Sequence, residues 1–393
     1  MHSEIITSID IGSHAIKIIV AEYSFGDEQP RILSSTKTES IGIKNGSIFH
    51  KKDALLSLSN ALKEAEEKSG VKIERIIISI GGISLETLYR TETVYFKEEN
   101  TTITNADINT LISNIEENTL ALYPNNMCID VIPGNFEYNG ISSFIKPIDV
   151  SANSLTASTL IMMFKKKELQ TILSLFKELK REVLKIIPAT EAVRASLLTK
   201  KQTSKQLCIV DIGGGTTSIG VYREGNLISY SVYPFGSENL TENISKELGI
   251  SYEFATRIKH GDHSIHITPI QKKAFTNVSR IFINDILETI EYHIHSIKRE
   301  TSITLIDTIY IGGGSLLSDF QTAVKKETHL LYTKPYLENL LIHKRKIESI
   351  IHAIAFGLIL IDINDLHQFG KRPKKITTYI KNFFKKLIEL FIP

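Results

Sequence analysis

The sequence predicts an α/β protein of at least two domains, organised around three glycine-rich loops. The chain has 393 residues, which is enough for two domains that each enclose a hydrophobic core. Short apolar runs with strand character alternate with segments whose apolar residues recur at helical spacing. Each glycine-rich loop directly follows an apolar run, so we expect all three loops at strand ends.

The loop near the middle of the chain follows the apolar run 207–210 and reads Asp211-Ile212-Gly213-Gly214-Gly215-Thr216-Thr217. This order predicts a strand, a tight turn and a second strand. Three successive glycines keep every Cβ away from a ligand, so several backbone N–H groups can point at one phosphate, and Thr216 and Thr217 add hydroxyl donors. Asp211 lies where its carboxylate can hold Mg²⁺ through water, because this hard cation takes oxygen ligands and retains much of its hydration.

Two further loops repeat the pattern. One glycine-rich hairpin is weak evidence, since an ordinary β-turn also needs flexible residues. Near the N-terminus, however, the apolar run 6–9 leads into Asp10-Ile11-Gly12-Ser13-His14, and an alternating strand pattern with Lys17 follows. A third loop, Gly312-Gly313-Gly314-Ser315, follows the run 309–311 and precedes a predicted helix. Three such loops favour a nucleotide site over three ordinary turns.

The order of these loops resembles the two phosphate loops and the adenosine loop of the actin, Hsp70 and sugar-kinase superfamily. Within it, the chain is most similar to the bacterial cell-division protein FtsA family. The resemblance implies an actin-like fold, with two RNase-H-type domains around a nucleotide cleft, an inserted small α+β subdomain and a C-terminal amphipathic helix. It also implies ATP and Mg²⁺ as cofactors, with Asp10 and Asp211 holding the metal through water. Residues 12–14, Lys17 and 213–217 would then wrap the phosphates, and 312–315 would form the floor below the adenosine.

The first domain is expected in residues 1–83 and 161–190, interrupted by an inserted subdomain at 84–160. Its beginning predicts three strands, a helix at 52–69 and a strand at 75–80, which is the half-unit order of the superfamily. Within the insertion, Val131-Ile132-Pro133 is similar to a motif of the FtsA-specific subdomain, although a surface elaboration of another kind is the alternative. The segment 147–152 departs from the glycine-rich stretch that the family usually carries there.

The second domain is expected at 191–361, with an upper lobe near 226–300. Gly236 fits the family's turn at the nucleotide floor, and Arg257 and Lys259 resemble its basic nucleoside-side motif. Thr256 stands where the family has an acid that can contact the ribose hydroxyls, so we expect weaker or altered nucleoside selectivity. Glu191 could orient the attacking water, because a carboxylate near the γ-phosphate can do so; an acid that favours the dipole of a helix's first turn explains it equally well.

Composition excludes several other classes of protein. Lysine and arginine total 46 against 44 acidic residues, and no basic stripe with interleaved aromatics occurs in the body of the chain, so no nucleic-acid partner is expected. Cys128 and Cys208 are the two cysteines, which argues against a disulfide framework and for a reducing compartment. The start lacks the basic region of a signal peptide, and no apolar run approaches the roughly 20 residues of a spanning helix. We therefore expect a cytoplasmic protein.

Histidines cluster in two places, at 260, 263 and 266 and at 293 and 295. His293 and His295 would lie on different sides of the predicted helix 272–299, because residues two positions apart on a helix diverge. Solvated or capping histidines explain both groups better than a metal site does.

The last segment predicts an amphipathic helix at 374–391, which follows a linker at 362–373. One half of the helical wheel is apolar and the other is nearly pure lysine. Its membrane-facing residues would be Ile376, Ile380, Phe383, Phe384, Leu387 and Phe391, with Lys381 and Lys385 beside them. A lysine face over an apolar face suits an anionic bilayer surface, as in the similar membrane-targeting helix of FtsA. A helix that packs on a protein core is the alternative.

The resemblance implies a protein that binds ATP, polymerises, lies at the cytoplasmic face of the cell membrane at the division septum, and anchors filaments of the tubulin homologue FtsZ. Its partners would be FtsZ, further copies of itself, anionic membrane lipids and, through residues 84–160, later divisome proteins. Nucleotide would act as a conformational switch with weak ATPase activity, although Ser218 replaces an acid usual in the family and the hydrolysis rate stays open. The alternatives are a small-molecule kinase of the same superfamily and an actin-like pilus-assembly scaffold.

Overall fold

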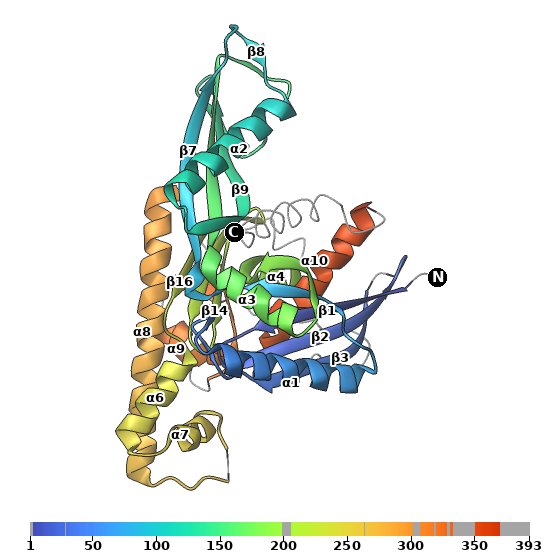
Figure 1. The fold of residues 1–393 in the computed structure, drawn as a ribbon. Coiled ribbons are helices and arrows are strands. Elements are labelled where there is room, and N and C mark those ends of the chain that lie inside the picture. The colour runs from blue at the N-terminus through green and yellow to red at the C-terminus, as the bar shows by residue number, and fades with distance from the viewer. Residues whose placement is uncertain are drawn as a thin grey trace.

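Two five-stranded sheets form the body of the protein, and a smaller sheet rises from the first of them (Figure 1). The computed structural model describes residues 3–27, 29–198, 206–262, 264–301, 307–317, 320–327, 331–332 and 350–369. The predicted membrane helix at 374–391 lies outside these residues. The predicted linker at 362–373 begins too early, because the helix that starts at Ala353 continues to Phe369.

The first sheet has the strand order β13-β6-β1-β2-β3. β1, β2 and β3 form an antiparallel meander, and β6 and β13 extend the sheet in parallel on the other side of β1. The Ser34 hydroxyl donates to the Ala65 carbonyl of α1, whereas its neighbour Ser35 contacts His352, which directly precedes α10 (Ala353–Phe369), so these helices cover opposite faces. The elements are β1 (Ser3–Ile11), β2 (Ala15–Ser24), β3 (Arg31–Glu39), β4 (Ile43–Lys44), β5 (Ser47–Ile48), α1 (Lys51–Ser69), β6 (Arg75–Ile80), α3 (Lys166–Glu178) and β13 (Glu182–Pro188).

Helix α1 illustrates how the sequence specifies these elements. Its buried face includes Ala54, Leu58, Leu62 and Ala65, which recur at the three- and four-residue spacing of an apolar helical stripe. The helix ends at Gly70, whose φ of 71° lies in the left-handed region that glycine adopts at little cost.

The second sheet repeats the arrangement of the first, with the order β16-β15-β14-β17-β18. β14, β15 and β16 form the meander, and β17 and β18 add in parallel. Two such sheets confirm the predicted pair of RNase-H-type domains. The elements are β14 (Gln206–Ile212), β15 (Thr217–Arg223), β16 (Asn226–Tyr233), α6 (Ser237–Leu248), α7 (Tyr252–Lys259), α8 (Pro269–Thr301), β17 (Asp307–Ile311), α9 (Phe320–Glu327) and β18 (Leu331–Tyr332).

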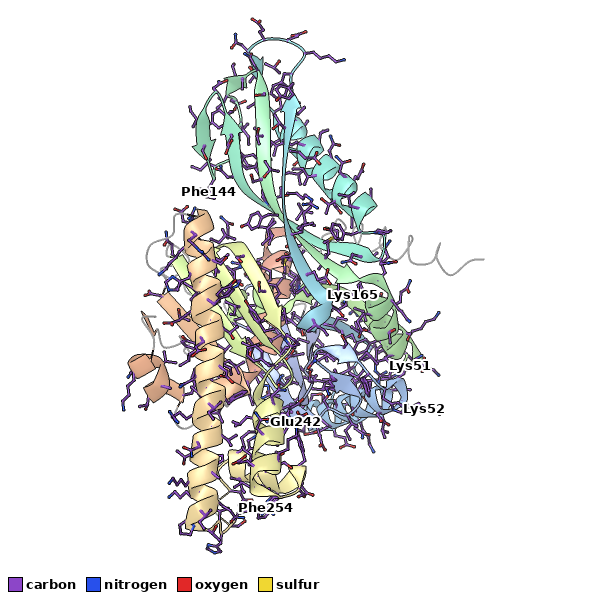
Figure 2. All side chains as sticks on the ribbon, turned by 90° about the vertical axis from the view of Figure 1, so that its left-hand side faces the viewer. Lys51, Lys52, Phe144, Lys165, Glu242 and Phe254 are labelled. Atoms are coloured by element: carbon purple, nitrogen blue, oxygen red, sulfur yellow. The ribbon has the colours of Figure 1, made fainter. Side chains whose placement is uncertain are left out.

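The inserted subdomain has its own sheet, in the order β10-β9-β12-β7, and its own core. Its helix α2 begins with a capping box in which Thr104 and Asp107 each bond the other's backbone. Figure 2 shows the subdomain as an arm above the body of the molecule. The elements are β7 (Leu85–Tyr95), β8 (Thr101–Thr102), α2 (Asn105–Leu122), β9 (Asn126–Tyr138), β10 (Ile141–Ser143), β11 (Ser151–Ala152) and β12 (Ser154–Lys165).

Strand β12 ties the arm to the body. Ala157, Ile161 and Met163 belong to the core of the arm, whereas Leu160 and Phe164 belong to the core of the first domain. The strand therefore runs through the predicted boundary at 160, and its side chains alternate between the two cores.

Two helices connect the domains and cross each other. α4 (Ala189–Leu197) leads into the second domain, and α10 (Ala353–Phe369) returns to the first. A Cβ on Gly357 would lie 1.7 Å from the carbonyl oxygen of Ala192, so the crossing requires glycine at this position.

Among the described residues, the window Ile350–His367 is the one helical stretch long and apolar enough to span a membrane by length and composition, which corrects the expectation that no such run exists. It is 56% buried inside the protein. The window also contains Asp362 and Asp365, and both carboxylates bond to the ammonium of Lys185 on β13. These features identify α10 as a core helix whose apolar surface is covered by protein.

The Lys185 ion pairs predict a large effect on stability. Lys185 and Asp362 are 4% and 0% exposed, so replacing Lys185 with methionine would leave the buried Asp362 carboxylate without this cation. We expect Lys185→Met to lower the free energy of unfolding by about 3 to 5 kcal/mol in denaturant titrations.

A surface ion pair supplies the matched control. Lys51 pairs with Glu178 between α1 and α3, where both side chains are about half exposed. Because water screens such a pair, Lys51→Met should cost less than about 1 kcal/mol. Equal costs for the two lysine variants would contradict a buried, stabilising role for Lys185.

Candidate functional site

A cavity of about 440 Å³ lies between the two domains and is lined by residues of both. The turn between β1 and β2 and the turn between β14 and β15 contribute to it, and so does the loop after β17. The three glycine-rich loops that the sequence singled out therefore meet at one cavity.

The first hairpin places a carboxylate beside an ammonium. Asp10 near the end of β1 lies opposite Lys17 on β2 in the antiparallel register. The Lys17 ammonium lies 2.8 Å from one Asp10 oxygen, and the Ser79 hydroxyl donates to the other at 3.0 Å. Burial acts to lower the pKa of Lys17, but Asp10 and Asp211 outweigh it, so the pKa is raised and the ammonium is held in its charged form.

The second hairpin brings Asp211 to the same floor. Burial raises the pKa of Asp211 to about 6, and the Asp10 charge adds to this effect while Lys17 opposes it. Within the described part of the chain, no side chain forms a hydrogen bond or ion pair with Asp211. Its carboxylate is thus available to a cation in the cavity.

The glycines allow the loops to approach each other closely. A Cβ on Gly214 would lie 2.8 Å from the Cβ of His14 in the opposite hairpin and 2.9 Å from Glu238 Oε1. Gly312 has a φ of 80°, and a Cβ there would lie 2.4 Å from Asp211 Oδ1. Side chains at these positions would separate the loops or fill the space next to the carboxylate.

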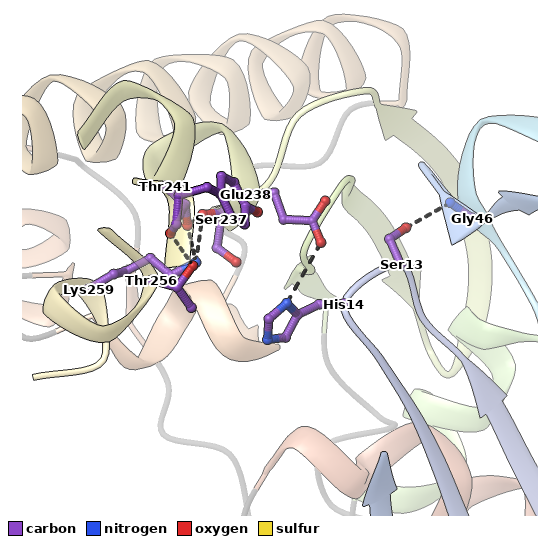
Figure 3. Close-up of polar contacts among 9 residues, drawn as sticks. Ser13, His14, Gly46, Ser237, Glu238, Thr241, Thr256 and Lys259 are labelled. Carbon is purple, nitrogen blue, oxygen red and sulfur yellow. Dashed lines mark hydrogen bonds and ion pairs between the residues drawn. The ribbon is translucent and has the colours of Figure 1, made fainter. Parts of the chain in front are cut away.

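The rim of the cavity carries further charged groups (Figure 3). His14 Nδ1 lies 3.8 Å from Glu238 Oε1, across the cleft between the domains. The Lys259 ammonium donates to the carbonyl of Ser237 at 2.9 Å and to the hydroxyl of Thr241 at 2.6 Å. Burial lowers the pKa of Lys259 to about 8, since Glu238 only partly offsets the loss of hydration.

Most of the site residues predicted from the sequence line this cavity. They are Asp10, Gly12, Ser13, His14, Lys17, Asp211, Gly213, Gly214, Gly215, Thr216, Lys259, Gly312 and Gly313.

Three further predicted residues do not line the cavity but contact the backbone of the loops or of the segment next to them. Thr217 is buried and donates to the carbonyl of Phe235 at 2.9 Å. Gly236 packs against the second hairpin, because a Cβ there would lie 2.4 Å from the Gly214 carbonyl oxygen. The Ser315 hydroxyl donates to the carbonyl of Gly312 at 2.8 Å.

The structure does not bring the other three predicted residues to the cavity lining. Glu191 accepts a 2.8 Å bond from Arg194 one turn along α4. Arg257 donates to Asp262 at 2.9 Å and is not among the residues that line the cavity. A Cβ on Gly314 would collide with the side chain of Ile212, so this glycine serves packing below the floor.

Several lining residues were not predicted. Lys37 lies opposite Lys17 on the neighbouring strand β3, and His260 follows Lys259 at the end of α7. Tyr230 reaches the cavity from β16, and Ser79 from the end of β6. The period-2 pattern of β3 could have placed Lys37 on one face, but only the strand register identifies its neighbour.

Comparison with known proteins identifies the relatives of this chain. A family model described as "Cell division protein FtsA" matches residues 208–350. The FtsA protein of Bacillus subtilis (strain 168) is 26% identical over 314 residues, which cover 75% of this chain and 70% of that protein. The FtsA protein of Streptococcus pneumoniae serotype 2 (strain D39) is 21% identical over 378 residues, which cover 92% of this chain and 82% of that protein. The chain is similar in sequence to the FtsA cell-division proteins.

The resemblance to FtsA predicted from the loops is thus confirmed, and so is the actin-like fold. A chain from a PilM–PilN type IV pilus biogenesis complex superposes with a TM-score of 0.65 at 13% sequence identity. The match covers 91% of this chain and 98% of that chain. At this identity the likeness concerns the fold alone, whereas FtsA proteins are related to the chain in sequence.

The raised pKa of Asp211 predicts a pH dependence of stability in metal-free protein. The folded state keeps a proton on Asp211 up to about pH 6, while the unfolded state releases it near the ordinary value of 3.8. The contribution of Asp211 to stability therefore falls as pH rises from about 4 to 6. Asp211→Asn should be more stable than the native chain by about 2 to 3 kcal/mol at pH 7, and this advantage should vanish near pH 4.

Thermal and denaturant unfolding in a chelating buffer at several pH values would check this expectation. Asp285→Asn is a suitable control because Asp285 is exposed on α8. A constant difference between Asp211→Asn and the native chain from pH 4 to 7 would refute a raised pKa.

Proposed function

We propose that the cleft binds ATP with Mg²⁺ and that the bound nucleotide acts as a conformational switch. The observation that carries this proposal is the convergence of two Asp-Ile-Gly hairpins, one from each domain, on one cavity floor. The backbone N–H groups of glycine-rich turns suit phosphate oxygens. A ligand held by both hairpins interacts with both domains, so its affinity differs between an open and a closed cleft.

The donor set on the floor fits Mg²⁺. Asp10 and Asp211 offer carboxylate oxygens, and these are the ligands that this cation prefers. Asp211 would be the more accessible of the two, because Lys17 and Ser79 already engage Asp10. When bound, the cation would neutralise phosphate charge and remove the unfavourable burial of the Asp211 carboxylate.

The described residues favour a switch over rapid hydrolysis. The acids that line the cavity are Asp10 and Asp211, and Glu191 is bound to Arg194. At the position next to Thr217, Ser218 supplies a hydroxyl that interacts with Tyr230. A neutral hydroxyl is a poor general base for water, so we infer that ATP turnover is slow.

We further propose that this FtsA relative polymerises at the cytoplasmic face of the membrane at the division septum and anchors FtsZ filaments there. Its relatives are named cell-division proteins, which supports a role in division. The membrane contact is assigned to the lysine-rich amphipathic segment 374–391 on its sequence pattern. The inserted subdomain at 84–160 would receive later divisome proteins.

Isothermal titration calorimetry tests the nucleotide site. We expect the native chain to bind ATP more tightly with Mg²⁺ than with a chelator. Asp211→Asn should lose most of this metal dependence, because an amide neutralises a cation poorly, while Asp285→Asn should retain it. Equal ATP affinity with and without Mg²⁺ in the native chain would contradict the assigned metal ligands.

Co-sedimentation with anionic liposomes tests the tether. The full chain should pellet with the vesicles and carry FtsZ with it, whereas a chain that ends at Arg372 should remain in the supernatant. Neutral vesicles provide the control, since the lysine face gains little from them. If both chains stay in solution, segment 374–391 has another role and the membrane assignment fails.

Two further assays on the full chain distinguish the proposed function from its two alternatives, a pilus-assembly scaffold and a small-molecule kinase. A pulldown that retrieved pilus-assembly proteins instead of FtsZ would favour the scaffold, whose fold this chain shares. Phosphate transfer to a small molecule would favour a kinase. The described lining offers a kinase no carboxylate apart from Asp10 and Asp211.

A further inference from the structure

Four basic side chains line the cleft in addition to Lys17. We call His14, Lys37, Lys259 and His260 the basic rim, and all four line the cavity. His14 and Lys37 belong to the first domain, while Lys259 and His260 belong to the second. The rings of His14 and His260 approach edge to face, with centroids 6.0 Å apart. The basic rim therefore spans the cleft.

Lys37 differs from the other cleft lysines in its surroundings. Lys17 is neutralised by Asp10 at 2.8 Å, and Lys259 is held by oxygens of Ser237 and Thr241. For Lys37, the part of the chain that the structure describes offers no ion-pair or hydrogen-bond partner. Its side chain is exposed within the open cleft, next to Lys17 on the adjacent strand.

The charges of Lys37 and Lys259 repel each other and disfavour protonation of the two histidines. Burial lowers the pKa of His14 to about 4, and the charges of Lys259 and Lys37 contribute to this shift. The pKa of Lys259 is lowered by burial and by Lys37, and that of Lys37 by burial and by Lys17. At neutral pH both histidines are uncharged and Glu238 offsets the charge of Lys259 in part, so the basic rim remains net positive.

We propose that the basic rim is a two-sided clamp for the phosphate chain of the nucleotide, with Lys37 as its arm in the first domain and Lys259 as its arm in the second. Each added phosphate charge strengthens the attraction to lysines on both sides and relieves their mutual repulsion. Because the arms belong to different domains, occupancy favours the closed cleft. This inference rests on the proposed nucleotide-binding function, and it assigns selectivity for phosphate number to a residue outside the three loops.

The test compares ATP, ADP, AMP and pyrophosphate binding by calorimetry in Lys37→Met, Lys37→Arg and the native chain. Lys37→Met should weaken ATP and pyrophosphate about tenfold and AMP less than about threefold, because AMP carries the fewest phosphate charges. Lys37→Arg should restore binding to within about threefold. Lys52→Met is the matched control, since Lys52 is exposed on α1 away from the cavity (Figure 2), and it should change none of these affinities.

A second readout separates a clamp from a structural role. Removing a repelled cation should leave the melting temperature of the nucleotide-free protein unchanged or higher, while the shift produced by ATP becomes smaller. Lys37→Gln serves in the same way if the methionine variant folds poorly. Unchanged ATP affinity in Lys37→Met, or equal losses for ATP and AMP, would overturn the clamp while the nucleotide site stands. Absence of ATP binding in the native chain would instead overturn the proposed function.

Discussion

The arrangement of the cleft depends on one buried electrostatic group, formed by Asp10, Lys17 and Asp211. Two carboxylates from different domains share a floor that water reaches poorly, and one ammonium must serve both. Lys17 is bonded to Asp10, so Asp211 bears the larger cost and its pKa rises. A group that is costly in the empty protein gains most when a cation arrives. The same feature therefore reduces the stability of the free chain and favours the loaded state.

This electrostatic group can form only because the two domains are held at a defined separation. The connecting helices α4 and α10 pass so closely at Gly357 and Ala192 that any side chain on Gly357 would force them apart. The bonds from Lys185 on β13 to Asp362 and Asp365 also hold α10 against the first sheet. Moving the domains apart at this crossing would break packing that is already close.

The sequence predicted those parts of the site that local chemistry determines. An apolar run that ends in Asp-x-Gly or in successive glycines specifies a strand and its turn without reference to the rest of the fold, so Asp10, Asp211 and Gly312 were all found. Lys37 could not be found in this way, because its importance comes from a neighbouring strand and from a helix more than 200 residues later. For Glu191, the sequence predicted the local structure but not the contact that the side chain makes. Its helix was predicted correctly, but the side chain bonds along the helix to Arg194 and not into the cavity.

Hydropathy alone likewise could not determine whether α10 is a membrane span or a core helix. Its composition alone satisfies the length and apolarity of a membrane span, yet Asp362 and Asp365 lie on a surface that the first domain covers. A sequence window cannot distinguish apolar residues that face lipid from apolar residues that face a sheet, because both environments exclude water. The paired Lys185 makes the distinction, and it lies about 180 residues earlier in the chain. Long-range contacts of this kind decide what a local pattern means, in the cleft as well as in the core.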